Sequence, residues 1–337
     1  MMSPIFTLPD PEYAEAFSAY RNYFEDLAGW IGGNYGWAGT LTEGVHDAVL
    51  LHQAAAKVNR RPIGEGRLSD LDKALRHAWG DLRRAYREIE EEDFDEEANA
   101  WLPAQIYYSA FHAARAYGFA SGQWVSNNHQ GVLNMVGRTV KRGLLPYPWS
   151  VSCSGCPQTG TVSFDGFGHI DDVHVLSRPD PATSGFRLAM FLRTTRDKEL
   201  KRRFIEERTK KVAPGRSRRN LSLAEKERIA GKLPPTTLFD IFWRLRKKAN
   251  YDDADTFVLG AAGSSDARRL GHALVIVADA TVAALEALIA LHIGPEPIAE
   301  LASAYAVKVR ADPESGLGRH VTAWKKRVRA DSEMPLR

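Results

Sequence analysis

Residues 107–116, YYSAFHAARA, hold several side chains that could do chemistry from one face of a helix. Helical spacing places Tyr108, Phe111, His112 and Arg115 at positions i, i+3, i+4 and i+7, on the same side. A helix that only fills a core would carry Leu, Ile and Val at these positions. Two aromatic rings and two groups that can be cationic favour a helix that lines a site. A core helix whose hydroxyl and imidazole groups are satisfied internally explains the same pattern, and both interpretations stay open.

A second helix, predicted over residues 236–251, carries a polar face beside its apolar one. Phe239, Trp243, Arg246 and Asn250 are spaced at i, i+4, i+7 and i+11. Together with Tyr251 they would present a guanidinium, an amide and a phenol near the helix end. These groups either form part of a site or tie helices together by hydrogen bonds.

A third pattern has the spacing of a metal site. Cys153 and Cys156 are separated by two residues, twelve more precede His169, and four separate it from His174. This is the Cys2His2 spacing of zinc sites, in a segment rich in Gly with β-type alternation. We expect a structural zinc knuckle there, or else a hairpin with two unpaired thiols and two surface histidines.

A fourth pattern is a concentration of positive charge. Residues 193–232 contain fifteen Lys or Arg against six acidic residues, whereas residues 88–97 contain eight acids. Cations in such a run can neutralise nucleic-acid phosphates. Phe204 is the only aromatic residue among them, so base stacking is not indicated. A solvated basic helix and loop is the other explanation. The cations predicted to contact nucleic acid are Arg202, Arg203, Lys210, Lys211, Arg216, Arg218 and Arg219.

The whole chain sets the frame for these patterns. Its 337 residues, 44% of them hydrophobic, can build a sizeable core, and two cysteines cannot form a secreted disulfide framework. No signal peptide is predicted. The most apolar run, residues 273–293, contains Asp279 and Glu286, which would be costly in lipid. We therefore expect a buried helix, no membrane contact and a cytoplasmic protein. No P-loop, dinucleotide fingerprint or HExxH motif is present.

Periodicity predicts a mainly α fold. Residues 1–65 are expected to form a helical N-terminal extension, with a Gly-rich loop over residues 31–41. Residues 66–294 form the main helical domain, with a β-rich insertion at residues 143–180 and a basic helix and loop at residues 193–232. Residues 295–337 are expected to be a polar basic tail.

Three of these segments together resemble one family. The run YYSAFHAARA resembles the YYAAFxAARA helix of standalone prokaryotic HEPN-domain proteins, and NHQGV at residues 128–132 resembles their His-x-Gly-Val element. LRKKANYD at residues 245–252 is similar to their Leu-Arg-x-Lys-Ala-Asp-Tyr-Asp element. The resemblance covers about residues 69–294, with residues 143–235 mostly an insertion.

The resemblance implies a HEPN-like helical bundle that forms a homodimer and works in toxin–antitoxin or antiviral defence systems, with a partner protein from the same system. Many relatives are metal-independent RNases in which an Arg and a His, separated by four to six intervening residues, act on the ribose 2′-hydroxyl and the phosphate. In this chain no His follows an Arg at that spacing, and Asn250 stands where the family pattern has Asp.

Two functions follow as expectations. The first is a protein that binds RNA or a nucleotide and cleaves RNA, in which Arg246 would hold the phosphate and His129 or His112 would move protons, with Tyr251 beside them. The second is a non-catalytic dimerisation or sensor module that recruits an effector.

Overall fold

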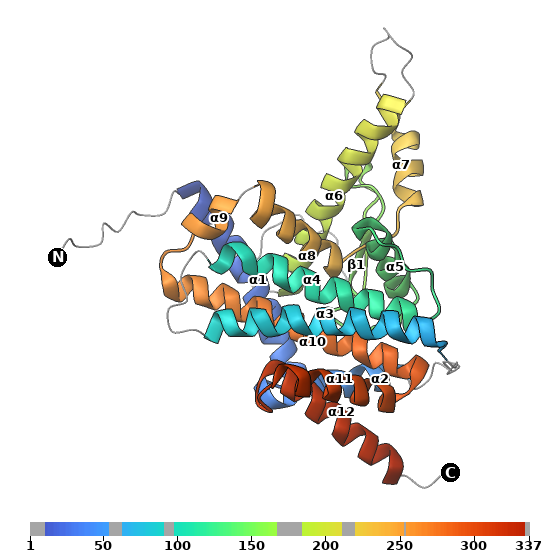
Figure 1. The fold of residues 1–337 in the computed structure, drawn as a ribbon. Helices are drawn as coiled ribbons and strands as arrows, with labels where there is room; N and C mark the ends of the chain where they lie inside the picture. The colour runs from blue at the N-terminus through green and yellow to red at the C-terminus, as the bar shows by residue number, and fades with distance from the viewer. Residues whose placement is uncertain are drawn as a thin grey trace, which may run out of the picture. The chain divides into compact units, whose positions relative to one another are not determined.

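The computed structural model describes residues 11–53, 63–90, 98–166, 184–210, 220–252 and 254–333. In this part of the chain there are twelve α-helices and one small three-stranded sheet, which confirms the mainly α fold class (Figure 1). The chain divides into two compact units. Unit 1 comprises Met1–Val125 and Leu245–Arg337, and unit 2 comprises Ser126–Arg244.

Unit 1 is a helical bundle. Its elements are α1 (Pro11–Tyr35), the short η1 (Ala38–Thr40), α2 (Leu41–His52), α3 (Glu65–Glu90), α4 (Ala98–Ala120), the end of α8 (Leu238–Lys247), the π-helical turn η4 (Lys248–Asp252), α9 (Ala254–Leu259), α10 (Ser264–Ile293), α11 (Pro295–Val309) and α12 (Gly316–Glu333).

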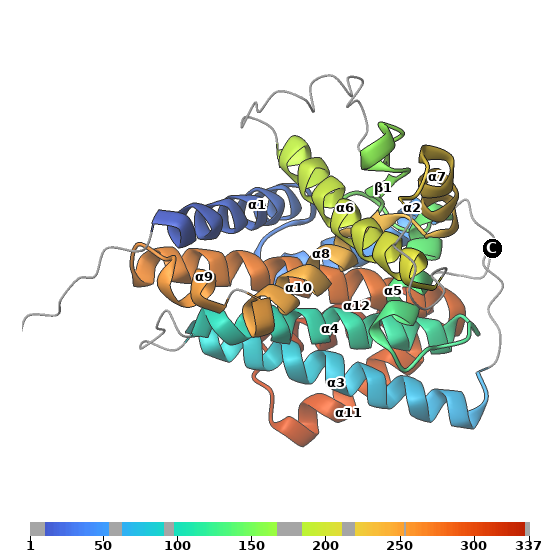
Figure 2. The same cartoon turned by 90° about the horizontal axis from the view of Figure 1, so that it is seen from above.

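Helix α10 is the core of unit 1, as its apolar sequence predicts. It packs against α1, α2, α3 and α4, and Figures 1 and 2 show α3, α4 and α10 side by side. A helix that is apolar on all sides has to be buried on all sides. Its length and hydropathy would also suit a membrane span, but 89% of its most apolar window is buried inside the protein. Each fully buried Leu or Val contributes about 1.5–3 kcal/mol of stability.

In helix α3, Leu71, Leu75, Ala78 and Leu82 are buried along one face, at the spacing of an amphipathic helix. At the N-terminus the structure differs from the expectation, because α1 continues to Tyr35 through part of the expected Gly-rich loop. Packing of α1 on α10 offsets the low helix propensity of these glycines. A Cβ at Gly32 would overlap the ring of Trp37, so a larger residue there would require this half-exposed ring to move.

The expected polar basic tail is also different in the structure. Pro295 begins α11, and α12 follows it. The two helices pack on each other, and α12 also packs on α2 and α3. Leu317, His320, Val321 and Trp324 are spaced at i, i+3, i+4 and i+7 and are all buried. Arg319 within this stretch and Lys325, Lys326, Arg327 and Arg329 directly after it give the segment a basic composition that hides the narrow buried face in the sequence.

Unit 2 combines helices with the sheet. Its elements are α5 (His129–Lys141), β1 (Ser152–Ser154), the short η2 (Pro157–Thr159), β2 (Ser163–Asp165), α6 (Ser184–Lys210), α7 (Leu223–Lys232), β3 (Thr236–Thr237) and the start of α8. The strand order is β2-β1-β3, with Cys153 opposite Phe164 on one side and Thr236 on the other. Thr236 and Thr237 were expected to begin a helix, but pairing with β1 makes them a strand.

Arg196 of α6 connects the parts of unit 2. It is 2% exposed, and its guanidinium donates to the carbonyl oxygens of Gly155 (2.7 Å), Pro234 (3.0 Å) and Ala230 (3.0 Å). A buried guanidinium has to be satisfied in this way, because an unpaired one is costly. One side chain therefore fixes α6 against the β1–η2 turn, the approach to β3 and the end of α7.

Candidate functional site

A polar seam in unit 1 joins two of the segments that the sequence singled out. Arg246, in the last turn of α8, donates from Nη2 to Oη of Tyr108 on α4 at 2.8 Å. Its guanidinium carbon lies 5.1 Å from the ring centroid of Tyr108 and 5.8 Å from that of Tyr107. Arg246 is only 8% exposed. Cation–π contact and the hydrogen bond together orient this guanidinium.

His112 extends the seam along α4. Its ring stacks on that of Tyr108, with 6.2 Å between centroids, and lies 5.0 Å from the ring of His77 on α3. Tyr108 is thus flanked by an imidazole and a guanidinium. Arg246 and His112, which come from two distant segments, therefore contact the same ring.

Two further residues that the sequence singled out, Arg115 and Asn250, lie on the segments that form the seam. The guanidinium of Arg115 lies 5.9 Å from the rings of both Phe111 and Phe119 on its own helix. Asn250 lies in the π-helical turn η4, a feature often found at functional sites. Its Oδ1 is buried and accepts no hydrogen bond within the described part of the chain. The side chain of Tyr251 lies outside the described residues.

The side chains of the seam have the chemistry to bind a nucleotide and to transfer a proton. A guanidinium binds a phosphate with charge-assisted hydrogen bonds, and an aromatic ring can stack on a base. An imidazole can transfer a proton near neutral pH. Tyr108, His112 and Arg246 supply these three groups within one contiguous set of contacts.

The other predicted proton-transfer residue, His129, belongs to unit 2. It is the first residue of α5, where Asn128 caps the helix by accepting from the Gly131 N–H at 2.7 Å. The His129 ring stacks on Trp243 with 4.5 Å between centroids. Unit 2 therefore holds His129, whereas unit 1 holds His112 and Arg246.

Two of the arginines predicted to contact nucleic acid already form ion pairs on the surface of α6. Arg202 bonds to Glu199 at 2.9 Å and also pairs with Glu206, and Arg203 bonds to Glu199 at 3.0 Å. The hydrogen bond with Glu199, together with the nearby carboxylates, raises the pKa of Arg202. These arginines are neutralised along the helix. Lys210 ends α6, and its side chain, with Lys211, Arg216, Arg218 and Arg219, lies outside the described residues.

The proposed zinc ligands are only partly described. Cys153 lies in β1 and Cys156 precedes η2, and both are buried free thiols. Burial raises the pKa of Cys153 to about 12, which favours the thiol over the thiolate that zinc needs unless a cation is bound beside it. His169 and His174 lie outside the described residues.

Sequence reasoning missed a buried cluster of acids and histidines in unit 1. Glu286 of α10 accepts from the indole N–H of Trp79 (2.5 Å) and of Trp324 (2.8 Å). His320 Nδ1 and His46 Nε2 lie 2.9 Å and 3.3 Å from its Oε2. We call His46, Asp279, Glu286 and His320 the buried cluster.

His320 is the positive centre of the buried cluster. Its Nε2 lies 2.6 Å from Oδ1 of Asp279. Burial alone would lower its pKa, but Glu286 and Asp279 raise the pKa of His320 to about 10. Burial likewise opposes the charge of Glu286, yet the His320 cation and the hydrogen bonds from both histidines hold the pKa of Glu286 well below its usual range. For His46, burial outweighs Glu286 and lowers the pKa.

The cluster was detectable in the sequence only in part. Asp279 and Glu286 are seven residues apart, which places both on one side of an otherwise apolar helix. Such buried charges require partners. Those partners, from α2 and α12, come from segments in which no local pattern marks them.

The buried cluster also has the composition of a metal site. His46, Glu286 and His320 offer ligand atoms that all lie within 4.8 Å of one another. However, Glu286 already accepts from two indoles and two imidazoles, so the described contacts satisfy it without a cation. Its best-supported role is to hold α2, α3, α10 and α12 together.

Comparison of the chain with family models, with curated proteins and with solved structures finds no match in any of the three.

Proposed function

We propose that this protein is a HEPN-type helical protein of prokaryotic defence or toxin–antitoxin systems that binds RNA or a nucleotide at the polar seam. The observation that carries the proposal is the hydrogen bond from Arg246 to Tyr108, with His112 stacked on the same ring. Two of the three motifs that carry the HEPN resemblance thus contribute to one set of contacts.

The roles of the seam residues follow from their chemistry. Arg246 binds a phosphate oxygen, because its guanidinium is held by Tyr108 and needs little reorganisation. Tyr108 provides an aromatic surface next to it. In an RNA-cleaving form, the ribose 2′-oxygen attacks the phosphorus and the bond from phosphorus to the 5′-oxygen breaks. His112 takes the proton of the 2′-hydroxyl and gives it to the departing 5′-oxygen, while Arg246 stabilises the charge that develops on the phosphate.

Binding and cleavage are tested with a fluorescent single-stranded RNA of twelve nucleotides and with total cellular RNA. Arg246→Ala is expected to weaken binding by at least tenfold, since a charge-assisted hydrogen bond contributes about 1.5–3 kcal/mol. Arg84→Ala is the matched control, because Arg84 is a largely exposed arginine of unit 1 paired only with Asp81 among the described residues. Equal affinity of the Arg246→Ala variant and wild type would overturn the proposal.

His112→Ala separates the catalytic form from the binding form. Cleavage that disappears in this variant while RNA binding persists assigns RNase activity to the seam. Melting temperatures of all variants, measured by circular dichroism, show whether a loss reflects unfolding.

The second candidate function is a non-catalytic module that dimerises and recruits an effector. The absence of an Arg and a His at the family's spacing in the sequence favours it. RNA that is bound but stays intact in the presence of wild-type protein, with a dimer mass by light scattering, would support this candidate.

A further inference from the structure

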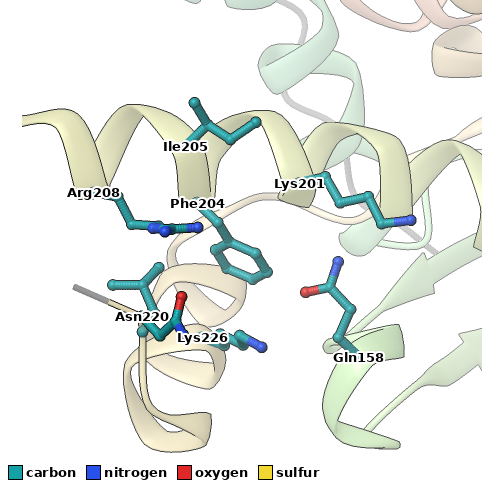
Figure 3. Close-up of a pocket in the computed structure, with 8 residues that line it drawn as sticks. Gln158, Lys201, Phe204, Ile205, Arg208, Asn220 and Lys226 are labelled. Atoms are coloured by element: carbon teal, nitrogen blue, oxygen red, sulfur yellow. The ribbon is translucent and has the colours of Figure 1, made fainter. Parts of the chain in front are cut away.

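Unit 2 contains a pocket of about 320 Å³ between α6, α7 and η2 (Figure 3). This is within the range of small-molecule sites, which begin near 300 Å³. Three kinds of side chain line it: the apolar groups Phe204, Ile205 and Leu221, the cations Lys201, Arg208 and Lys226, and the amides Gln158 and Asn220. The patterns in the sequence did not group these residues into one site.

The apolar side of the pocket is preformed. Phe204 is 6% exposed and belongs to a small core that includes Cys156, Leu200 and Ala230. The bond from Arg196 to the Ala230 carbonyl fixes α7 against α6 beside this core. A ligand ring would therefore meet a surface that does not have to be ordered first, which favours affinity.

Helix α6 presents two different faces of charge. Glu199, Arg202, Arg203 and Glu206 form ion pairs with one another along one face. The pocket face carries Lys201, Phe204, Ile205 and Arg208, spaced at i, i+3, i+4 and i+7. On one face of α6 the arginines are therefore neutralised by glutamates, whereas on the other face Lys201 and Arg208 line the pocket.

The three cations of the pocket differ in whether they form an ion pair. Lys201 pairs with Asp197 at 2.7 Å, and Gln158 donates to the same carboxylate at 2.9 Å. Arg208 and Lys226 form no ion pair with any residue that the structure describes. Lys226 Nζ lies 6.0 Å from the Phe204 ring centroid. Figure 3 shows Arg208 and Lys226 extending toward this ring from α6 and α7.

Arg208 also retains hydrogen-bonding capacity. Its Nε is buried and has no hydrogen-bond partner within the described segments. A buried donor that lacks an acceptor is costly, and a ligand oxygen would remove that cost. A planar guanidinium is well suited to two oxygens of a phosphate.

We propose that this pocket binds a nucleoside monophosphate. Arg208 and Lys226, which form no ion pair within the described part of the chain, hold the phosphate. The base packs against Phe204, and the amides of Gln158 and Asn220 offer both donors and acceptors to its polar edge. This site lies in unit 2 and does not depend on the RNA-binding seam of unit 1.

The test is isothermal titration calorimetry of the full-length protein with AMP, adenosine and inorganic phosphate. AMP is expected to bind at least tenfold more tightly than either fragment, because only AMP uses both halves of the pocket. Phosphate that binds as tightly as AMP would overturn the base contact with Phe204. Adenosine that binds as tightly as AMP would overturn the phosphate contact. No heat from AMP at millimolar concentration would overturn the site altogether.

Variants localise the binding. Arg208→Ala and Lys226→Ala are each expected to weaken AMP binding by at least tenfold. Arg202→Ala is the matched control, because Arg202 lies on the same helix but on the ion-paired face, and it should leave AMP affinity unchanged. If both pocket variants melt at the wild-type temperature and bind AMP as wild type does, the pocket is not the site. RNA binding through Arg246 is measured in parallel and should not change in these variants.

Discussion

His320 Nε2 lies 2.6 Å from Oδ1 of Asp279, and neither side chain is more than 1% exposed. The charge of this histidine is stabilised from both sides, because its other ring nitrogen faces Glu286. Asp279 also accepts from the hydroxyl of Tyr86 and lies 3.6 Å from a nitrogen of Arg319. Two acids and two cations thus form a balanced network inside unit 1.

Replacing His320 by Gln should strongly destabilise unit 1. The substitution removes the cation that balances Asp279 and Glu286 in a site without solvent. Breaking a buried ion pair by removing one partner costs about 3–5 kcal/mol. Urea unfolding followed by circular dichroism measures this change. His52→Gln, at an exposed position of α2, is the control and should change stability by no more than about 0.5 kcal/mol. An equal loss of stability in His320→Gln and His52→Gln would contradict the stabilising role of the buried cluster.

The pH dependence of stability should also report His320. Its pKa in the folded protein is about 10, above the ordinary value of 6.5. Between these values the folded state binds more protons than the unfolded state, so stability falls as pH rises. The contribution of His320 is complete below pH 6.5 and is lost as pH passes through about 10. Unfolding free energies at pH 6.5, 8 and 9.5 should decrease in wild type and decrease less steeply in His320→Gln. Parallel slopes would argue against a charged His320.

Two substitutions of Asp240 in unit 2 should have different effects on the stability of the protein. Its Oδ2 accepts from the backbone N–H and the hydroxyl of Thr237, at 2.8 Å and 3.0 Å, and burial raises its pKa to about 6. Asp240→Asn keeps an acceptor and removes the buried charge, so at pH 7.5 it should be at least as stable as wild type. Asp240→Ala loses both hydrogen bonds and should cost about 1–2 kcal/mol.

The pH profile checks the same assignment for Asp240. Because the folded pKa is raised above 3.8, the contribution of protonated Asp240 to stability is present below pH 3.8 and is lost as pH rises through about 6. The difference between wild type and Asp240→Asn in thermal unfolding should therefore change over this window. A constant difference from pH 4 to pH 7 would show that the carboxyl is not perturbed.

The zinc knuckle remains a proposal with a direct measurement. If Cys153, Cys156, His169 and His174 hold a structural zinc ion, elemental analysis of the purified protein should find one zinc per chain. Cys153→Ser should remove it and lower the melting temperature. Ser152→Ala, at the neighbouring position of β1, should keep the metal. Protein that is produced in zinc-containing medium and lacks zinc after purification would contradict the proposal.

Local sequence signals determined most of the helices. The one-sided spacing of Leu71, Leu75 and Leu82 is typical of an amphipathic helix such as α3, and the largely apolar run at residues 273–293 predicts that α10 is buried. At the start of α7, Ser222 and Glu225 form a reciprocal capping box. Such features depend on residues within a turn or two of each other, so they can be recognised without knowledge of the fold.

Only the tertiary structure decided which polar groups meet. His46 is 240 residues from Glu286, Arg246 is 138 residues from Tyr108, and the pocket face of α6 needs Lys226 of α7 to become a site. The pairing of β3 with β1 likewise overrode a helical pattern at Thr236. A buried charge or a binding pocket depends on partners that distant segments bring to it. The sequence pattern of one segment therefore shows that a polar group is present, and the packing of the others decides whether it is balanced, exposed or directed toward a ligand.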